Sequence, residues 1–85
     1  MFNDKLPIEE RIFDFIEGKS YSDRSKITAQ TLLFKEGIFD SMGLMLLIDF
    51  LEDGIGIKVN NDDLIEKNFE SVSAIADFVF RKKSN

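Results

Sequence analysis

Histidine and cysteine are both absent from this 85-residue chain, and their absence removes most unaided enzymatic chemistry. The chain has no thiol nucleophile, no imidazole base and neither of the two side chains that bind zinc best. It also has no means of forming a disulfide, so packing alone must hold a core this small. We therefore expect a non-catalytic protein of marginal stability, with no catalytic residues and no metal site.

Basic residues are in short supply: 11 stand against 16 acidic ones, for a formal net charge of −5. Such a charge repels phosphate backbones and anionic lipid surfaces, so neither nucleic acid nor a membrane is an expected partner. Long apolar runs are also missing, since the longest, 44–48, is far shorter than the roughly 20 residues that cross a bilayer. The N-terminus carries Asp4, Glu9 and Glu10 where a signal peptide has basic and apolar regions. We expect a cytoplasmic location.

Apolar residues make up 44% of the chain and charged residues 32%, which is the composition of one small soluble domain. We expect residues 1–85 to form that single domain as a monomer. One apolar face predicts a first helix, with Pro7 in its first turn and Gly18 at its end. The residues of this face are Ile8, Ile12, Phe15 and Ile16.

Residues 19 to 39 are predicted to form a long loop, because their apolar spacing is irregular and polar residues dominate. The side chains expected to anchor this loop are Ile27, Leu32, Leu33 and Phe34. A loop of this length in a compact domain is either functional or conceals a missed element. Its position just before Ser41 favours a function.

A second helix is expected to begin at Asp40 or Ser41, either of which can cap it, and to end near Asp53 and Gly54. At 100° per residue, one side of this helix is apolar and forms its core face. The core face consists of Leu44, Leu47, Ile48 and Leu51.

The same helical wheel places three apolar residues beside acidic ones, outside the core face. These residues are Met42, Met45 and Leu46, and with the neighbouring Asp49 we call them the docking patch. Scattered exposed apolar side chains are ordinary. Clustered next to Ser41, and including adaptable methionines, they favour a partner-docking surface.

Gly54 and Gly56 break the second helix, and the alternating apolar residues that follow fit either a short strand or an extended connector. A single strand has nothing to pair with, so we expect a connector. Asn60 or Asn61 then caps a short helical turn over 62–65. Asp62 and Asp63 could be a metal or acid–base pair, but adjacent helical residues point apart and no calcium-loop spacing is present, so a structural role is favoured.

Ser71 is expected to cap a last helix that Arg81, Lys82 and Lys83 close at the negative end of its dipole. Its apolar stripe is Val72, Ile75, Ala76, Val79 and Phe80. Three basic residues could bind a polyanion, but on an acidic protein they more often close a helix. Residues 1–5 and 82–85 are expected to fray.

The predicted fold is an all-α four-helix bundle, with three main helices, one short helix and a long first loop. Its expected core is Ile12, Phe15, Ile16, Leu47, Leu51, Ile75 and Val79. Within this frame the segment 37–44, GIFDSMGL, resembles the phosphopantetheine-attachment motif of acyl and peptidyl carrier proteins. The resemblance extends to the loop anchor at 32–34, the segment 57–59 before the short helix, and the segment 69–72 at the start of the last helix.

The resemblance implies that a transferase attaches the phosphopantetheine of coenzyme A to Ser41, making the chain a phosphoprotein. The arm's thiol then carries an acyl or aminoacyl group as a thioester between partner enzymes. In that family the transferase uses magnesium, which Asp40 is expected to assist, while Met42 and Gly43 flank the arm. Gly43 is expected to leave space where the arm or a partner lies close.

The branch of the family is indicated by departures from its fatty-acid members, which have acidic residues through the middle of this helix. Here Met45 and Leu46 stand there, Met42 replaces the usual leucine after the serine, and Gly43 replaces a polar residue. These departures favour a specialised carrier of aminoacyl or polyketide type, paired with a stand-alone adenylating ligase, over a fatty-acid role.

Two other functions remain open from the residues alone. The first is a small acidic helical interaction module without a prosthetic group, in which Ser41 serves only as a helix cap. The second is a serine hydrolase, which has little support because the chain has no histidine to activate Ser41 and no nucleophile-elbow glycine pattern.

Overall fold

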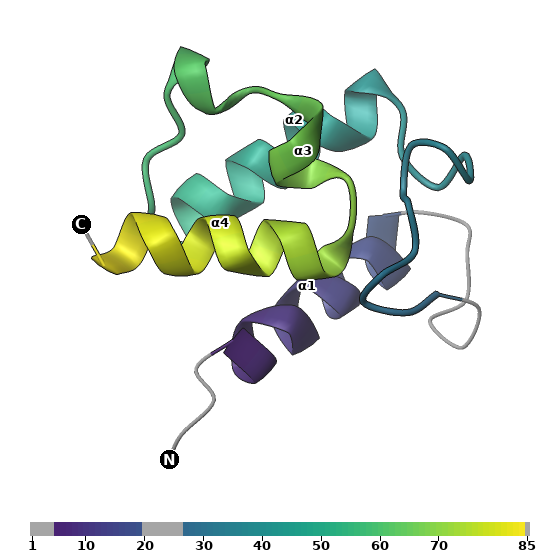
Figure 1. The fold of residues 1–85 in the computed structure, drawn as a ribbon, viewed down its shortest axis with the longest axis horizontal. Helices are drawn as coiled ribbons and strands as arrows, with labels where there is room; N and C mark the ends of the chain where they lie inside the picture. The colour runs from purple at the N-terminus through teal and green to yellow at the C-terminus, as the bar shows by residue number, and fades with distance from the viewer. Residues whose placement is uncertain (1–4, 20–26, 85) are drawn as a thin grey trace.

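The computed structural model describes residues 5–19 and 27–84, and the fold of these ranges is all-helical, as predicted (Figure 1). No strand occurs in the described ranges, so the apolar alternation after Gly54 belongs to a connector. The elements are α1 (Lys5–Lys19), α2 (Ser41–Asp49), the π-helix η2 (Phe50–Ile55), the 3₁₀ turn η3 (Asn61–Asp63), α3 (Glu66–Phe69) and α4 (Val72–Ser84).

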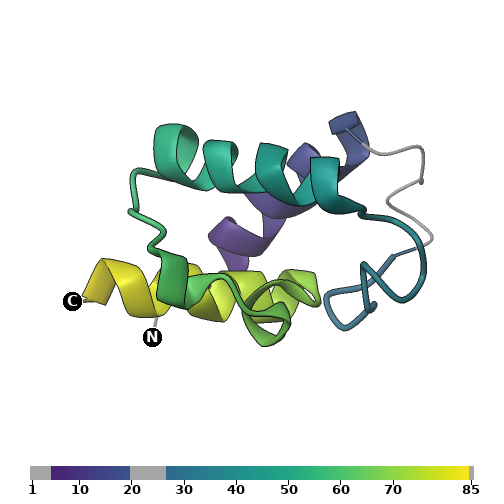
Figure 2. The same ribbon diagram turned by 90° about the horizontal axis from the view of Figure 1, so that it is seen from above.

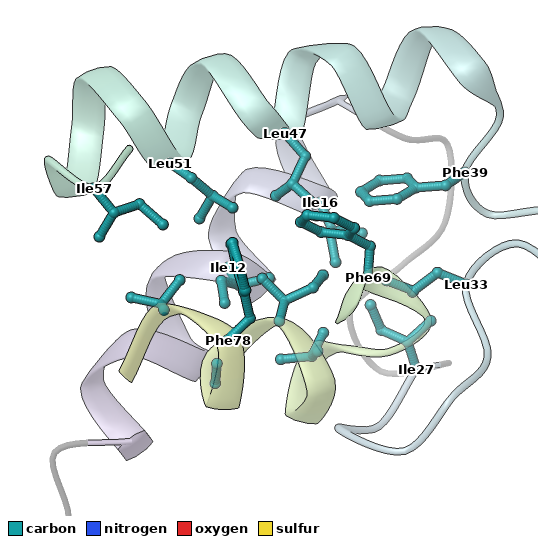
Figure 3. Packing of buried hydrophobic residues seen from close by; sticks show 14 residues of the cluster. Ile12, Ile16, Ile27, Leu33, Phe39, Leu47, Leu51, Ile57, Phe69 and Phe78 are labelled. Atoms are coloured by element: carbon teal, nitrogen blue, oxygen red, sulfur yellow. The ribbon is translucent and has the colours of Figure 1, made fainter. Parts of the chain in front are cut away.

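The core lies between α1, α4 and the single rod that α2 and η2 form together (Figure 2). Figure 3 shows Leu47 and Leu51 pointing from this rod toward Ile12 and Ile16 of α1. These four side chains are fully buried, as are Ile75 and Val79 of α4. The predicted core is confirmed at six of its seven positions, those named here. Phe15 is only half-buried and stacks on Phe50 at the rim, with 4.8 Å between ring centroids.

The buried stripe of α4 differs from the prediction at one position. Phe80 is exposed, whereas Phe78 is buried and packs edge-on against Phe69 of α3, with 5.2 Å between ring centroids. The reason is that α4 is covered on two sides, by α1 and by α3. The predicted stripe assumed one side only.

The rod of α2 and η2 ends one residue later than predicted, through a widened final turn. The backbone amide of Gly56 donates to the Leu51 carbonyl at 3.0 Å, a bond five residues long, and the φ of 91° at Gly56 then turns the chain away. Arg11 of α1 donates to the Gly54 carbonyl at 2.8 Å. Gly54 leaves room for the Phe50 ring, because a Cβ there would lie 3.1 Å from ring atom Cδ1.

The connector buries Ile57, as expected, but the helical turn after it is shorter than predicted. It ends at Asp63, and a separate short helix, α3, follows at Glu66. Asp63 explains the early stop, because its side chain accepts from the Asn60 amide at 2.9 Å and pairs with Lys82 at 2.8 Å. These contacts hold Asp63 against the end of α4.

Ser71 caps α4 as predicted, with its Oγ accepting from the Ala74 amide at 3.1 Å. The expectation of fraying from residue 82 is wrong for the part described, since α4 remains helical to Ser84 and the ion pair with Asp63 holds Lys82. The expectation is also wrong for Lys5, which is the first residue of α1, while residues 1–4 and 85 lie outside the described residues.

Of the predicted loop 19–39, Lys19 belongs to α1 and residues 20–26 lie outside the described residues, whereas residues 27–39 are hydrogen-bonded to the chain around the start of α4. The backbone amide of Leu33 donates to the Glu70 carbonyl at 2.7 Å, and the backbone amide of Ser73 donates to the Ala29 carbonyl at 2.8 Å. Ile27 and Leu33 are buried anchors, as expected, and Phe34 is half-buried. Leu32 is exposed and does not anchor the loop, because its neighbour Leu33 takes the inward position.

Candidate functional site

Asp40 caps α2, which decides between the two capping residues that the sequence left open. Its backbone is extended, and its Oδ1 accepts from the Gly43 amide at 2.9 Å. Its carbonyl accepts from the Leu44 amide at 3.0 Å and so begins the helix. Ser41 is the first helical residue, and its hydroxyl is not used as the cap.

Ser41 is exposed at the positive end of the helix dipole. The capping bonds occupy the amides of Gly43 and Leu44, which leaves those of Ser41 and Met42 without a partner among the residues described. Free amides at a helix N-terminus stabilise an anion. The position therefore fits a phosphodiester attached to the serine hydroxyl.

Backbone hydrogen bonds at the end of the loop fix the segment that precedes Ser41. The Leu33 carbonyl accepts from both the Ile38 amide at 2.8 Å and the Phe39 amide at 3.0 Å. Gly37 makes the required reversal with a φ of 77°, which non-glycine residues rarely adopt. Phe39 belongs to the buried core cluster (Figure 3), and its ring packs edge-on against Phe34 with 6.0 Å between ring centroids. Ser41 thus stands two residues after a buried aromatic side chain.

Gly43 has a different role from the open space expected beside it. A Cβ at this position would lie 3.1 Å from Cδ1 of Phe39 and 3.6 Å from Oδ1 of Asp40. The room that glycine provides is thus filled by the Phe39 ring. Gly43 allows the anchor to lie close under the first turn of α2.

The docking patch is brought together on α2 as the helical wheel indicates. Met42 and Met45 are 64% and 65% exposed, Leu46 is 38% exposed, and Asp49 is exposed one turn further along. The first of these residues follows Ser41 directly. Along α2, the exposed apolar side chains of Met42, Met45 and Leu46 therefore lie between Ser41 and Asp49.

A cleft that the sequence did not predict opens between α2, α3 and the loop, with a volume of about 280 Å³. It is lined by Phe34, Leu44, Leu64, Ile65, Glu66 and Phe69. These residues come from three separate segments, so no local pattern could have joined them. The one sequence signal was the unexplained apolar pair Leu64 and Ile65, which are 47% and 51% exposed.

Asp63 takes part in an ion pair with Lys82, which agrees with the structural role favoured for it from the sequence. The Lys82 ammonium, followed by the Asn60 amide, lowers the pKa of the Asp63 carboxyl, which suits a structural ion pair. Over the ranges 5–19 and 27–84 no three potential ligands are close enough to hold a metal ion. Over the same ranges no helix has the length and apolarity to span a membrane.

Curated relatives match most of the chain, although no protein-family model does. A D-alanyl carrier protein of Lactococcus lactis subsp. lactis strain IL1403 is 34% identical over 76 residues, covering 89% of this chain and 96% of the relative. A D-alanyl carrier protein of Lactococcus lactis subsp. cremoris strain MG1363 is 33% identical over 69 residues, covering 81% and 87%. The match therefore includes nearly the whole length of these relatives.

Proposed function

Because the chain belongs to the phosphopantetheine-attachment carrier-protein family of the D-alanyl carrier proteins, we propose that Ser41 bears its 4′-phosphopantetheine arm. The arm's terminal thiol then holds an aminoacyl group as a thioester. The observation that carries this proposal is the exposed Ser41 hydroxyl at a helix start whose cap is a different residue. The serine is thereby left free for modification.

The residues around Ser41 fit the arm's phosphodiester. The unpartnered amides of Ser41 and Met42 would donate to its oxygens, and the helix dipole favours its negative charge. Asp40 uses only Oδ1 as the cap, which leaves Oδ2 available to assist the magnesium ion of the transferase. When bound, the arm supplies the thiol that a chain without cysteine lacks.

An aminoacyl cargo is favoured over a fatty acyl or polyketide one. The relatives are named for D-alanine, and their names do not point to fatty-acid, polyketide or nonribosomal-peptide synthesis. Met45 and Leu46 also stand in the middle of α2, where the sequence resemblance leads one to expect the acidic residues of a fatty-acid carrier. We therefore assign D-alanine or a similarly small amino acid as the cargo.

The partners in this proposal are three enzymes: a phosphopantetheinyl transferase, a stand-alone ligase that adenylates the amino acid, and a downstream transferase that receives it. The carrier itself contributes no catalytic group. The three enzymes share one approach, along Met42, Met45 and Leu46 toward Ser41.

The test is the intact mass of the chain before and after incubation with coenzyme A, magnesium and a broad-specificity phosphopantetheinyl transferase. We expect the mass to rise by one phosphopantetheine, and we expect no increase for Ser41→Ala. This control should stay folded, because Asp40 and not Ser41 caps α2. A folded wild-type chain that gains no mass would contradict the proposal and favour the interaction module without a prosthetic group.

A further inference from the structure

Two of the three methionines of the chain lie in the docking patch beside Ser41. Met42 and Met45 are 64% and 65% exposed, more than any other large hydrophobic residue that the structure describes. The chain has no cysteine, histidine or tryptophan, so its methionine sulfurs are the atoms that a hydroperoxide oxidises first. The surface proposed to dock partner enzymes is therefore also the surface most open to oxidation.

We propose that Met42 and Met45 form a reversible oxidation site, at which a hydroperoxide weakens the docking of partner enzymes. Each thioether sulfur attacks the peroxide bond, takes one oxygen atom and becomes a sulfoxide, while the other oxygen leaves as water or an alcohol. The sulfur loses two electrons and the peroxide gains them. Methionine sulfoxide reductases return two electrons from thiols and release the oxygen as water. The inference rests on the proposed function, since it concerns the enzymes that act on Ser41.

Oxidation at these two positions leaves the fold intact. Neither methionine belongs to the buried core cluster or to the partly buried residues packed against it. The cap of α2 is an oxygen of Asp40 bonded to the Gly43 amide, and this bond involves no sulfur. We therefore expect the sulfoxides to remain in water and to leave the melting temperature nearly unchanged.

The docking patch, in contrast, depends on both side chains being apolar. Met42 and Met45 are three residues apart on α2 and are therefore neighbours on its surface. A sulfoxide oxygen is a hydrogen-bond acceptor, and burying it against an apolar partner surface without a donor is unfavourable. α2 contains no lysine or arginine to act as that donor, and the carboxylate of Asp49 only accepts. The sulfoxides would lose water on docking and gain no partner from α2.

Leucine at both positions would remove this sensitivity and keep the patch apolar. Leucine and methionine are similar in volume and exchange with little effect on packing, but leucine has no sulfur. The sequence resemblance leads one to expect leucine at position 42 in fatty-acid carriers. Methionine there adds a reaction with hydroperoxides that the usual residue cannot undergo.

The experiment oxidises the chain with hydrogen peroxide before the arm is attached, removes the peroxide, and measures the KM of the phosphopantetheinyl transferase for the chain. Without the arm the chain has no thiol, so the intact mass counts methionine oxidation directly and should rise by three oxygen atoms. We expect oxidation to raise the KM about tenfold, as for polar groups buried without partners at an interface. Treatment with both methionine sulfoxide reductases should restore the original KM.

The matched control is the double variant Met42→Leu/Met45→Leu. It keeps Met1, so it should take up one oxygen atom. Its oxidised and untreated forms should have the same KM. The comparison is made within each chain, oxidised against untreated, so the KM of the untreated variant does not affect the conclusion.

A second readout follows the methyl groups of ¹³C-labelled methionine by NMR during oxidation. Met42 and Met45 should oxidise about as fast as free methionine, because both are largely exposed. An excess of the transferase, without coenzyme A, should slow both reactions by covering the patch. Oxidation that the transferase does not slow would overturn the assignment of these residues to the docking surface.

Two results separate this inference from the proposed function. Equal KM values for oxidised and untreated wild type, or a rise as large in the leucine variant, would overturn the oxidation site. The mass increase on Ser41 would still support the carrier function in that case. An untreated wild-type chain that takes no arm at all would overturn both.

Discussion

At the scale of single residues, Asp40 combines a structural role with a proposed one, and two substitutions separate them. Asp40→Ala removes the cap on the Gly43 amide and should lower the free energy of unfolding by about 1 kcal/mol. Asp40→Asn keeps a capping oxygen and should leave stability nearly unchanged. Urea unfolding measures both. A loss as large for asparagine as for alanine would mean that charge, and not the cap, stabilises this end of α2.

The same pair of variants tests the proposed role of Asp40 in magnesium-dependent modification. Asp40→Asn should be folded but modified slowly by the phosphopantetheinyl transferase, because an amide binds magnesium more weakly than a carboxylate does. The rate of mass increase at a fixed concentration of transferase provides the measurement. A wild-type rate for Asp40→Asn would remove Asp40 from the site.

The same substitution, glycine to alanine, should affect stability differently at Gly18 and at Gly43. Gly18→Ala in α1 should stabilise the fold by up to about 1 kcal/mol, because alanine favours the helix and nothing lies within 4 Å of the added methyl. Gly43→Ala should lose that gain, because the methyl would press on the buried Phe39 ring at 3.1 Å. Thermal unfolding of the two variants tests the difference. A stabilised Gly43→Ala would show that Phe39 can move freely.

At the scale of elements, the pairing of Asp63 with Lys82 fastens η3 to α4 and should make stability depend on acid. The folded chain lowers the pKa of Asp63 below its unfolded value of about 4. The ion pair therefore stabilises the fold fully above about pH 4 and loses its effect as the pH falls through the lower, folded pKa. Asp63→Asn should lower the melting temperature at pH 7, and this difference should shrink as the pH falls below about 4.

Asp62→Asn serves as the control for this element, because Asp62 is exposed and forms no ion pair among the described residues. Its melting temperature should follow that of the wild type throughout. A difference for Asp63→Asn that stayed constant down to the lowest pH would show that the charge of Asp63 does not stabilise the fold.

The sequence predicted those elements whose signals are local. The capping signals at Asp40 or Ser41 and at Ser71, with the long apolar faces of α1 and α2, located the main helices, and the structure then identified Asp40 as the cap of α2. The sequence did not predict α3, a four-residue helix without a capping side chain, whose Phe69 is buried and packs against Phe78 of α4. The π-helical turn at η2 was also missed, because a contact distant in sequence supports it: Arg11 of α1 donates to the Gly54 carbonyl.

At the scale of the whole molecule, the net charge of −5 and the apolar docking patch make different predictions about partner binding. We expect apolar contact to dominate, so the KM of the phosphopantetheinyl transferase for the carrier should change little between about 0.05 and 0.3 M salt. Met45→Ala should raise that KM several-fold without unfolding the chain, because Met45 is largely exposed. A steep rise of KM with salt would instead assign the interaction to charge.

The bonds from the loop to Glu70 and Ser73 also affect when the site is ready during synthesis. A ribosome makes Ser41 well before the residues that fix the preceding loop, and contacts so distant in sequence cannot form until both partners have emerged. An enzyme that recognises the folded start of α2 would therefore act on chains translated past Ser73. Attachment of the arm would then follow folding, and truncated chains would be left unmodified.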